Sequence, residues 1–197
     1  MRKINKLTPL PNFNGNNYNG NCTTWKDFHR SYKSIYEDTR WKILIDEQKQ
    51  QCGYTELYID NLEDSHIDHY RKRHLSPALT FTWDNFIVAT KDNNFGANYK
   101  DNNYNIQANE YVDIYNPVHD RVEEYFIYTE WGEIEERPGK VKKTVNVFNL
   151  NDEYLKKRRE KIIKLIDGYK RGGLSLSDIK STLKEYGFKS VVEQYCV

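Results

Sequence analysis

Cysteine is scarce in this chain of 197 residues, which contains only Cys22, Cys52 and Cys196. An odd count without a close pair excludes the disulfide framework of small secreted domains, and it excludes a four-thiolate zinc site. Long apolar runs are also absent: no segment reaches the roughly 20 apolar residues that cross a bilayer, and the N-terminus lacks the apolar core of a signal peptide. We therefore expect a cytoplasmic protein that does not enter a membrane.

The composition is rich in charged and aromatic residues. Only 38% of the residues are hydrophobic, whereas 30% are charged and 14% are aromatic, so amphipathic rings must provide much of the buried area. The 30 basic and 29 acidic residues are separated along the chain: residues 110–136 hold nine acidic residues and one basic, and residues 140–171 hold eleven basic and four acidic. The basic segment could bind along the phosphate backbone of a nucleic acid, or it could simply be a solvated helix face.

Three regions are expected, within one compact unit. Residues 1–23 read as an extended N-terminal arm, because Pro, Gly and Asn dominate residues 9–21. Residues 24–150 read as a central module with an N-terminal helical cover, in which Thr24 caps a helix from Trp25 and a second helix over 40–51 places Trp41, Leu44 and Ile45 on one face. Residues 151–197 read as C-terminal helices.

Alternation of apolar and polar residues, together with short apolar runs, predicts the remaining secondary-structure elements. Strands are expected at 52–59, 65–71 and 86–90, followed by a short helix over 98–101, and the segments 125–128 and 144–148 also look like strands. Asn151 or Asp152 should cap a long helix that Gly172 and Gly173 end, and Ser177 should cap a final one. The fold class is therefore α+β, and the strand–loop–strand–helix order is that of a ββα-metal module.

The candidate chemistry is concentrated in one stretch. His66, His69 and His74 lie within nine positions, with Asp68 between the first two. Phosphodiester cleavage needs a metal beside the scissile phosphate and a base for the attacking water. Asp68 and His69 can supply both functions where a strand ends, with His66 as a further catalytic candidate. The alternative is a metal-free surface strand with a salt-bridged histidine.

Several neighbours are assigned supporting roles. Asn85 should hydrogen-bond backbone across the loop and thereby hold the base histidine in orientation. Trp83 is expected in the core. Positive side chains near the motif could contact phosphates, and these are Arg71, Lys72, Arg73 and Lys100.

These residues resemble the HNH nuclease subunits of Septu-type and retron-associated antiphage defence systems. The resemblance covers most of the chain, and its most specific part is the Leu79-Thr-Phe-Thr-Trp-Asp-Asn85 run behind the Asp68-His69 pair. It implies an HNH fold with flanking helices, a single Mg²⁺ or Mn²⁺ bound by Asp68, His69 as the general base and Asn85 as the middle Asn of the motif. It also implies a partner, an ATPase of the ABC or SMC-like kind.

The chain departs from that family in two places. Many relatives have a Cys-x-x-Cys pair where this chain reads Cys52-Gly-Tyr-Thr55, so a structural zinc is not expected. The third motif usually has His or Asn three residues before its Lys, and here that position is Ala97. Asn98 is the nearest substitute as the second metal ligand, with Asn94 and Asp101 as rivals, and activity could be reduced.

The expected function is that of a metal-dependent HNH endonuclease that hydrolyses DNA, or alternatively RNA, as the effector of a defence complex with the ATPase. The first alternative is a catalytically degenerate HNH-fold subunit that acts through contacts with the ATPase, using an aromatic surface that includes Tyr54, Tyr58, Tyr70, Tyr99 and Tyr104. A zinc-bound regulatory module is the second, and the single Cys near the site argues against it.

Overall fold

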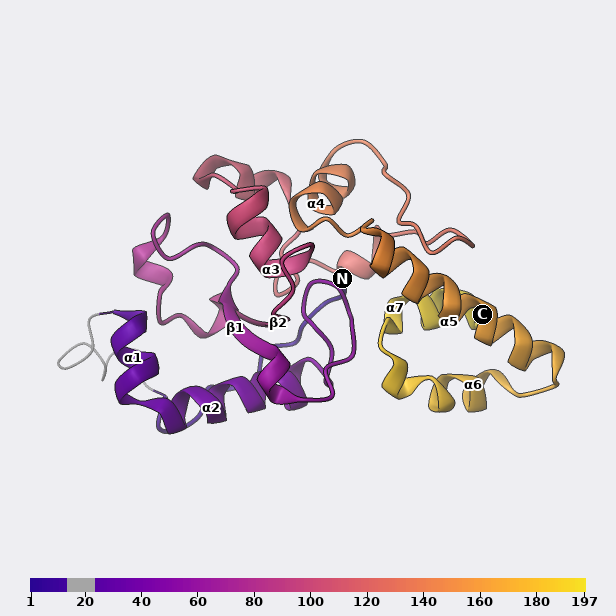
Figure 1. The fold of residues 1–197 in the computed structure, drawn as a ribbon, viewed down its shortest axis with the longest axis horizontal. Helices are drawn as coiled ribbons and strands as arrows, with labels where there is room; N and C mark the ends of the chain where they lie inside the picture. The colour runs from indigo at the N-terminus through magenta and orange to yellow at the C-terminus, as the bar shows by residue number, and fades with distance from the viewer. Residues whose placement is uncertain (14–23) are drawn as a thin grey trace.

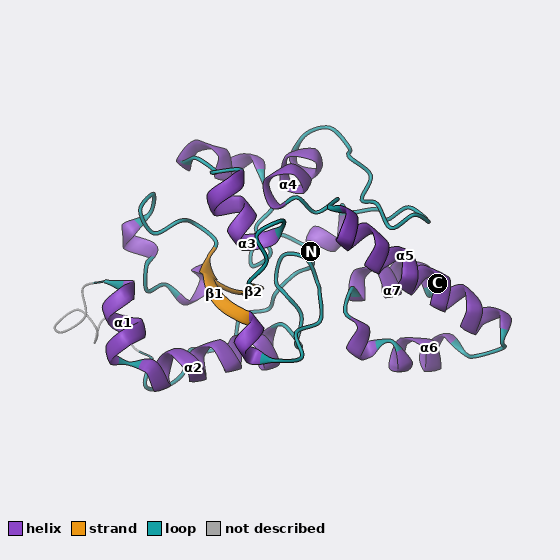
Figure 2. Cartoon of the chain, viewed as in Figure 1, coloured by secondary structure: helices purple, strands orange, loops and turns teal. Residues whose placement is uncertain are grey.

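A two-stranded antiparallel sheet is found in the computed structural model, which describes residues 1–13 and 24–197, and it lies in the part of the molecule opposite the C-terminal helices (Figure 1). Strand β1, Ser65–His69, pairs with β2, Phe86–Thr90, so that Asp68 is opposite Ile87 and His69 is opposite Phe86. The chain then enters helix α3, Gly96–Asn98, which continues as a π-helix over Tyr99–Asn103. The α+β class, these two strands and the following short helix are confirmed (Figure 2).

Helices α1 and α2 run along one side of the sheet (Figure 1). Helix α1, Trp25–Ser31, begins as predicted, because the Thr24 hydroxyl accepts a hydrogen bond from the Asp27 N–H at 3.1 Å. Helix α2, Lys33–Lys42, starts well before the predicted position and continues as a π-helix over Ile43–Glu47. The predicted start of the second helix at residue 40 was therefore wrong.

The face of α2 that is buried also differs from the predicted one, which included Trp41. Trp41 is 51% exposed, while Arg40 is turned inward and is buried. The Arg40 guanidinium donates to the Ser65 carbonyl at 2.8 Å and pairs with Glu63 at 3.0 Å. These contacts join α2 to the start of β1, and the sequence pattern of apolar residues could not reveal them.

Four helices form the C-terminal part: α4, Lys140–Phe148; α5, Glu153–Arg171; α6, Leu176–Thr182; and α7, Lys189–Tyr195. Asp152 caps α5 and Gly172 ends it, as predicted. The cap of α6 is Ser175 rather than Ser177, and α7 was not predicted. Short 3-10 helices occur at Leu62–Asp64, Pro77–Leu79, Trp83–Asn85, Ala108–Asp113, Val122–Glu124 and Lys184–Tyr186.

Three predicted strands are absent from the described residues. Residues 144–148 belong to α4, which buries Val141, Thr144, Val145 and Phe148 at helical spacing. A short apolar run does not distinguish a strand from a buried helix, which explains the error. In the segments 125–128 and 52–59 the only strand-like pairings are the isolated bridges Tyr128–Ile134 and Gln51–Tyr58.

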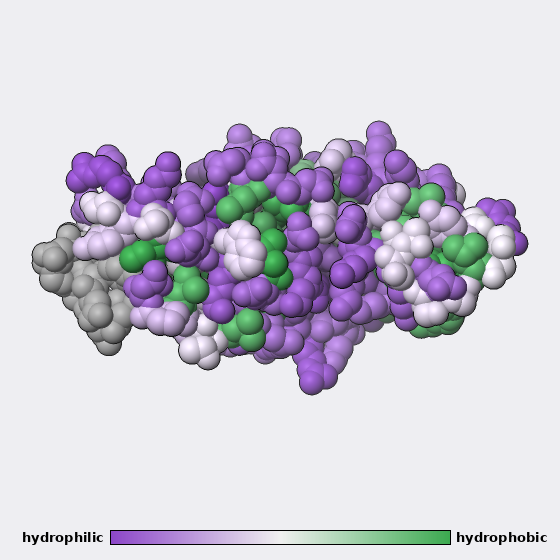
Figure 3. All heavy atoms as spheres, turned by 90° about the horizontal axis from the view of Figure 1, so that it is seen from below, coloured by the Kyte–Doolittle hydropathy of each residue, from purple (hydrophilic) through white to green (hydrophobic). Residues whose placement is uncertain are grey.

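The buried apolar side chains form one cluster that spans the described chain, from Ile4 through Ile87 to Ile163. The described part of the N-terminal arm contributes to it: the Ile4 N–H donates to the Pro117 carbonyl at 2.7 Å. Residues 14–23 of the predicted arm lie outside the described residues. Hydrophilic residues cover most of the face shown in Figure 3, with small apolar patches among them, as expected for a chain with so few apolar residues.

A buried arginine ties α5 to a tight turn. Arg159 is 2% exposed, and its guanidinium donates to the carbonyls of Gly132 and Leu150, at 2.5 and 2.8 Å. Gly132 has a φ of +74°, and a Cβ atom there would lie 2.3 Å from the Lys156 carbonyl oxygen. The turn can approach α5 this closely only because residue 132 has no side chain.

Candidate active site

A cleft of about 550 Å³ opens where β1 ends. Its walls come from α1, β1, the loop after β1 and the π-helix at 99–103. The lining residues are Trp25, His66, Ile67, Asp68, His69, Lys72, Arg73, His74, Asn98, Asp101, Asn102 and Asn105. The fold therefore brings His66, Asp68, His69 and Asn98 together, as the sequence predicted.

The imidazole of His69 is held by a hydrogen bond to backbone and by packing against two aromatic rings. Its Nε2 lies 2.8 Å from the Thr80 carbonyl oxygen, so Nε2 carries the hydrogen and Nδ1 remains an acceptor. The imidazole packs edge-on against Trp25 and Phe86, with ring centroids 4.5 and 5.1 Å away. Burial lowers the pKa of His69 to about 4 against the smaller opposing effects of Thr80 and Asp68. The imidazole is therefore neutral at pH 7.

Asp68 is buried beside this histidine and is engaged on one oxygen. Its Oδ2 accepts a hydrogen bond from the Tyr54 hydroxyl at 2.5 Å and lies 3.3 Å from the Lys100 ammonium. Burial and the Asp68 charge together raise the pKa of Tyr54 well above its ordinary value. The phenol therefore stays protonated and donates the hydrogen bond to Asp68. Both contacts fall on Oδ2, and among residues 1–13 and 24–197 no hydrogen bond or ion pair involves Oδ1.

Lys100 is a correction to the sequence prediction. It was expected to contact phosphates, but its side chain is fully buried. Its ammonium lies 2.5 Å from the Asp101 carboxylate and 3.3 Å from both Asp68 Oδ2 and the His69 carbonyl oxygen. Burial alone would lower the pKa of Lys100, but Asp68 and Asp101 outweigh it and raise the pKa. Lys100 therefore holds two carboxylates and the end of β1 in place.

The other three predicted phosphate contacts differ in their accessibility. Lys72 is buried, and its ammonium donates to the Asp101 carbonyl at 2.7 Å and to Asn105 Oδ1 at 3.0 Å, so it is mainly structural. The Arg71 guanidinium lies over the ring of Tyr111 and does not line the cleft. Arg73 is exposed at the mouth of the cleft. Of the predicted set, Arg73 is thus the residue best placed to meet a phosphate.

Asn85 closes the loop between the two strands by hydrogen bonds to backbone. Its Oδ1 accepts from the Arg71 N–H at 2.8 Å, and its Nδ2 donates to the carbonyls of Arg71 and Leu79 at 3.1 and 3.2 Å. Leu79 immediately precedes Thr80, whose carbonyl orients His69. The amide therefore bonds across the loop in the way that the sequence indicated, and Trp83 beside it is in the core.

The three rival metal ligands separate in space. Asn98 and Asp101 line the cleft, whereas Asn94 lines a different pocket and its carbonyl accepts from Asn149. Asn98 Nδ2 donates to Asn93 Oδ1 at 3.1 Å, which leaves Asn98 Oδ1 available. Burial, followed by the charge of Asp68, raises the pKa of Asp101 despite Lys100. The geometry therefore excludes Asn94 as a candidate for the second metal ligand and keeps Asn98 and Asp101 as candidates.

His66 lies two residues before Asp68 on β1, on the same face of the strand. Burial lowers its pKa, and its Nδ1 is buried without a hydrogen-bond partner among the described residues. It is close enough to Asp68 for the carboxylate charge to act on it. His66 is thus a neutral imidazole that lines the cleft with unused hydrogen-bonding capacity.

The cleft contains oxygen donors of the kind that bind a hard divalent cation. Asp68, Asp101 and Asn98 offer oxygen atoms, the ligands that Mg²⁺ and Mn²⁺ prefer, and Mg²⁺ commonly uses one or two carboxylates together with waters and substrate phosphates. Within residues 1–13 and 24–197 no group of three or more His, Cys, Asp or Glu side chains is placed to hold a metal.

Sequence reasoning missed the side chains that support the two central residues. Tyr54 bonds Asp68 from 14 residues away, and Trp25 packs on His69 from the helical cover. No sequence pattern near Tyr54 or Trp25 indicates these contacts, because both contacts depend on packing between segments that are distant in the sequence. The proposed aromatic docking surface was also partly wrong, since Tyr54 and Tyr70 are buried.

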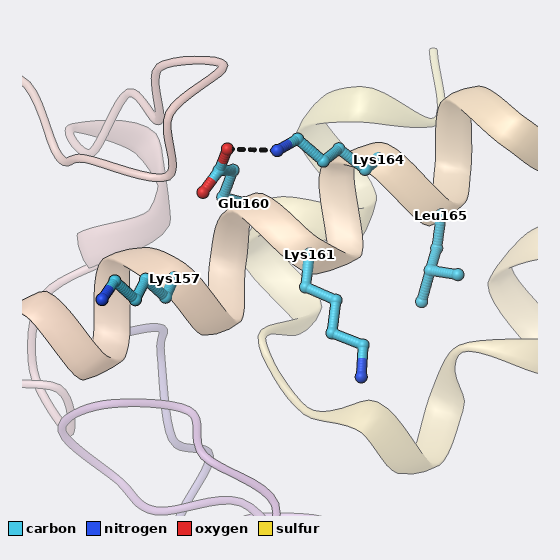
Figure 4. Close-up of a pocket in the computed structure, with 5 residues that line it drawn as sticks. All are labelled: Lys157, Glu160, Lys161, Lys164 and Leu165. Carbon is cyan, nitrogen blue, oxygen red and sulfur yellow. Dashed lines mark hydrogen bonds and ion pairs between the residues drawn. The ribbon is translucent and has the colours of Figure 1, made fainter.

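The basic segment at 140–171 forms α4 and α5, and a shallow depression lies on the exposed side of α5 (Figure 4). Lys157, Lys161 and Lys164 line it at helical spacing, and the Lys164 ammonium pairs with Glu160. Figure 4 shows these lysine side chains extending in different directions from the helix rather than converging on one point. This face is a diffuse positive surface.

Comparison with known proteins does not assign the chain to a family. Among the described residues, no helix is long and apolar enough to cross a membrane. No protein-family model matches the chain, and no curated protein matches it.

Proposed function

We propose that this chain is a metal-dependent endonuclease of the HNH type that hydrolyses phosphodiester bonds, DNA before RNA, as the effector of an antiphage defence complex with an ABC or SMC-like ATPase. The observation that carries the enzymatic part is the neutral, oriented His69 in the same cleft as Asp68. The partner and the defence role rest on the resemblance alone.

In the proposed reaction His69 Nδ1 takes the proton of the attacking water, while Thr80 holds the Nε2–H and fixes the ring. Asp68 and Asn98, with Asp101 as the alternative to Asn98, would hold Mg²⁺ or Mn²⁺. The ion would stabilise negative charge on the scissile phosphate and the leaving oxygen. Arg73, which lines the cleft, would bind a flanking phosphate.

Cleavage of plasmid DNA and of RNA in the presence of Mg²⁺ or Mn²⁺ tests this function. We expect cleavage of DNA that stops when EDTA is added. Absence of cleavage with either metal, with the ATPase present, would instead favour a catalytically degenerate subunit. Lys100 favours that alternative, because its ammonium already neutralises the carboxylates that a metal ion would use.

The pH dependence of cleavage should reveal the environment of His69. Its pKa in the folded protein is about 4, compared with 6.5 for an ordinary histidine, so the base stays unprotonated down to about that pH. We expect the acidic limb of the kcat/KM profile to fall well below pH 6.5. A limb centred near pH 6.5 would show that the base is a solvated histidine.

The same pKa shift affects stability with a definite sign. Because the folded pKa of His69 is depressed, its contribution to stability is complete above pH 6.5 and is lost as the pH falls from 6.5 towards about 4. Over that interval the unfolded chain binds a proton that the folded protein does not. Urea unfolding at several pH values, with a His69→Asn variant for comparison, measures this contribution.

Replacing Asn98 should identify the second ligand. We expect Asn98→Ala to weaken Mn²⁺ binding about tenfold, because the substitution removes one of few oxygen donors in the cleft. Asn94→Ala is the matched control, since Asn94 lies outside the cleft and should bind Mn²⁺ as the wild type does. Unchanged binding in Asn98→Ala together with lost binding in Asp101→Asn would assign the role to Asp101.

A further inference from the structure

Tyr54 is a buried tyrosine whose hydroxyl reaches the carboxylate of Asp68 from outside the cleft. Its side chain is 0% exposed, and it is not among the residues that line the cleft. The hydroxyl donates a hydrogen bond to Asp68 Oδ2 at 2.5 Å. Any effect of Tyr54 on a bound ion or substrate must therefore pass through Asp68.

The backbone beside Tyr54 is fixed against β2. The Gly53 N–H donates to the Val88 carbonyl at 3.0 Å. A Cβ atom at residue 53 would lie 2.3 Å from Ile87 Cγ2, so the turn approaches the strand closely. Ile87 is the residue that pairs with Asp68 in the sheet. The turn that carries Tyr54 is thus anchored at the position opposite Asp68.

The ring of Tyr54 is held as well as its backbone. It stacks on Phe148, the last residue of α4, with ring centroids 4.5 Å apart and an interplanar angle of 23°. Phe148 is itself 0% exposed. Because side chains in such an interior are closely packed, the phenol has little freedom to turn its hydroxyl away from Asp68.

The carboxylate of Asp68 depends on its partners for its orientation, because the torsion that turns an aspartate carboxylate has a broad energy minimum. Among the described residues, its hydrogen bond and its ion pair come from Tyr54 and Lys100, both on Oδ2. Without the tyrosine hydroxyl, either oxygen could turn towards the Lys100 ammonium. A divalent cation would then compete with that ammonium for a carboxylate whose orientation is less defined.

We propose that Tyr54 is a positioning residue of the metal site, whose hydroxyl orients Asp68 for the divalent cation. The inference rests on the proposed function, because it takes Asp68 as a metal ligand. The hydrogen bond also draws negative charge from the carboxylate, which by itself would weaken metal binding. Orientation is the larger effect, since partners that hold a ligand in place are commonly worth about 10–100-fold in metal affinity.

Calorimetric titration of Mn²⁺ into the wild type and into Tyr54→Phe tests the proposal. Tyr54→Phe removes the hydroxyl and keeps the ring, and we expect it to bind Mn²⁺ about tenfold or more weakly. Tyr128→Phe is the matched control. Tyr128 is buried, its hydroxyl donates to the buried carboxylate of Glu56 at 3.5 Å, and it does not line the cleft. This variant should bind Mn²⁺ as the wild type does.

The metal dependence of DNA cleavage gives a readout that a general loss of structure would not produce. Tyr54→Phe should need a higher Mn²⁺ concentration for cleavage. At saturating Mn²⁺ its rate should approach that of the wild type, because the base His69 is untouched. His69→Asn, in contrast, should stay inactive at every Mn²⁺ concentration.

Phe148→Leu is an independent variant, because it keeps the Tyr54 hydroxyl and removes the ring that holds it. It should also weaken Mn²⁺ binding, by less than Tyr54→Phe does, and melting curves in EDTA will show which variants are folded. If Tyr54→Phe does not fold, unchanged Mn²⁺ binding by Phe148→Leu would overturn the inference.

The outcomes separate this inference from the proposed function. Equal or tighter Mn²⁺ binding by folded Tyr54→Phe, or equal weakening by Tyr128→Phe, would overturn the role of Tyr54 and leave the proposed function intact. Absence of Mn²⁺ binding by the wild type would overturn the proposed function, and this inference with it.

Discussion

His69→Ala is expected to lower the rate of DNA cleavage by about 10²–10⁴-fold, the usual contribution of a positioned general base. The reason is geometric: Nε2 lies 2.8 Å from the Thr80 carbonyl oxygen, so Nδ1 is the ring nitrogen left to accept a proton. Initial rates of plasmid cleavage at saturating Mg²⁺ measure the effect. Binding of the ATPase should be unchanged, because the imidazole is buried and faces the cleft.

Two further variants separate lost chemistry from lost structure. His119→Ala removes an exposed histidine outside the cleft and should cleave at the wild-type rate. His69→Asn keeps a polar group beside Trp25 and Phe86 and should be folded but inactive. Wild-type cleavage by a folded His69→Ala protein would contradict the proposed mechanism.

Gly132→Ala should destabilise the fold by about 3 kcal/mol or more. A Cβ atom at this position would lie 2.3 Å from the Lys156 carbonyl oxygen and 2.6 Å from the Glu160 nitrogen, both in the backbone of α5. The turn would have to move away from the helix, and the bond from Arg159 to the Gly132 carbonyl would be lost. Leaving this buried guanidinium unsatisfied adds to the cost.

Gly139→Ala is the matched control, because Gly139 also has a positive φ, of +87°, but a Cβ atom there would meet nothing within 4 Å. It should cost less than Gly132→Ala, about 1–3 kcal/mol, from backbone strain alone, because the backbone of Gly139, with ψ of −141°, is in a conformation that residues with side chains rarely adopt. Urea unfolding of the two variants measures the difference. Equal destabilisation would show that close approach to α5 does not decide the requirement for glycine at position 132.

The sequence was informative wherever a local pattern determined the structure. Alternation around Ile67 and the apolar run at 86–90 predicted the two strands, and their pairing placed Asp68 and His69 together at the end of β1. Thr24 and Asp152 predicted helix starts because capping depends on neighbouring residues. The hydrogen bonds of Asn85 across the loop could be anticipated in the same way.

Long-range packing accounts for the errors. Lys100 was read as a phosphate contact because it is a positive residue near the motif in sequence, but the π-helix at 99–103 turns it inward between Asp68 and Asp101. The apolar run at 144–148 was read as a strand, and its helical burial became visible only when its neighbours were known. No local signal connects Tyr54 to Asp68, because their contact depends on the whole fold.

The position of Lys100 has a consequence for the proposed enzyme. An ammonium 3.3 Å from Asp68 Oδ2 opposes the approach of a divalent cation. A metal ion bound by Asp68 would therefore have to use Oδ1 or displace Lys100. Metal affinity, rather than the presence of the histidine, thus decides between the nuclease and a subunit that acts through protein contacts.

Calorimetric titration of Mn²⁺ and Mg²⁺ into the wild-type protein and into Asp68→Ala, with DNA cleavage assayed on the same samples, tests the central proposal most directly. We predict that the wild type binds one ion and cleaves DNA, and that Asp68→Ala, while still folded, does neither. Absence of metal binding by the wild type even with the ATPase present, or equal binding and cleavage by Asp68→Ala, would contradict the assignment of this cleft as a metal-dependent nuclease site.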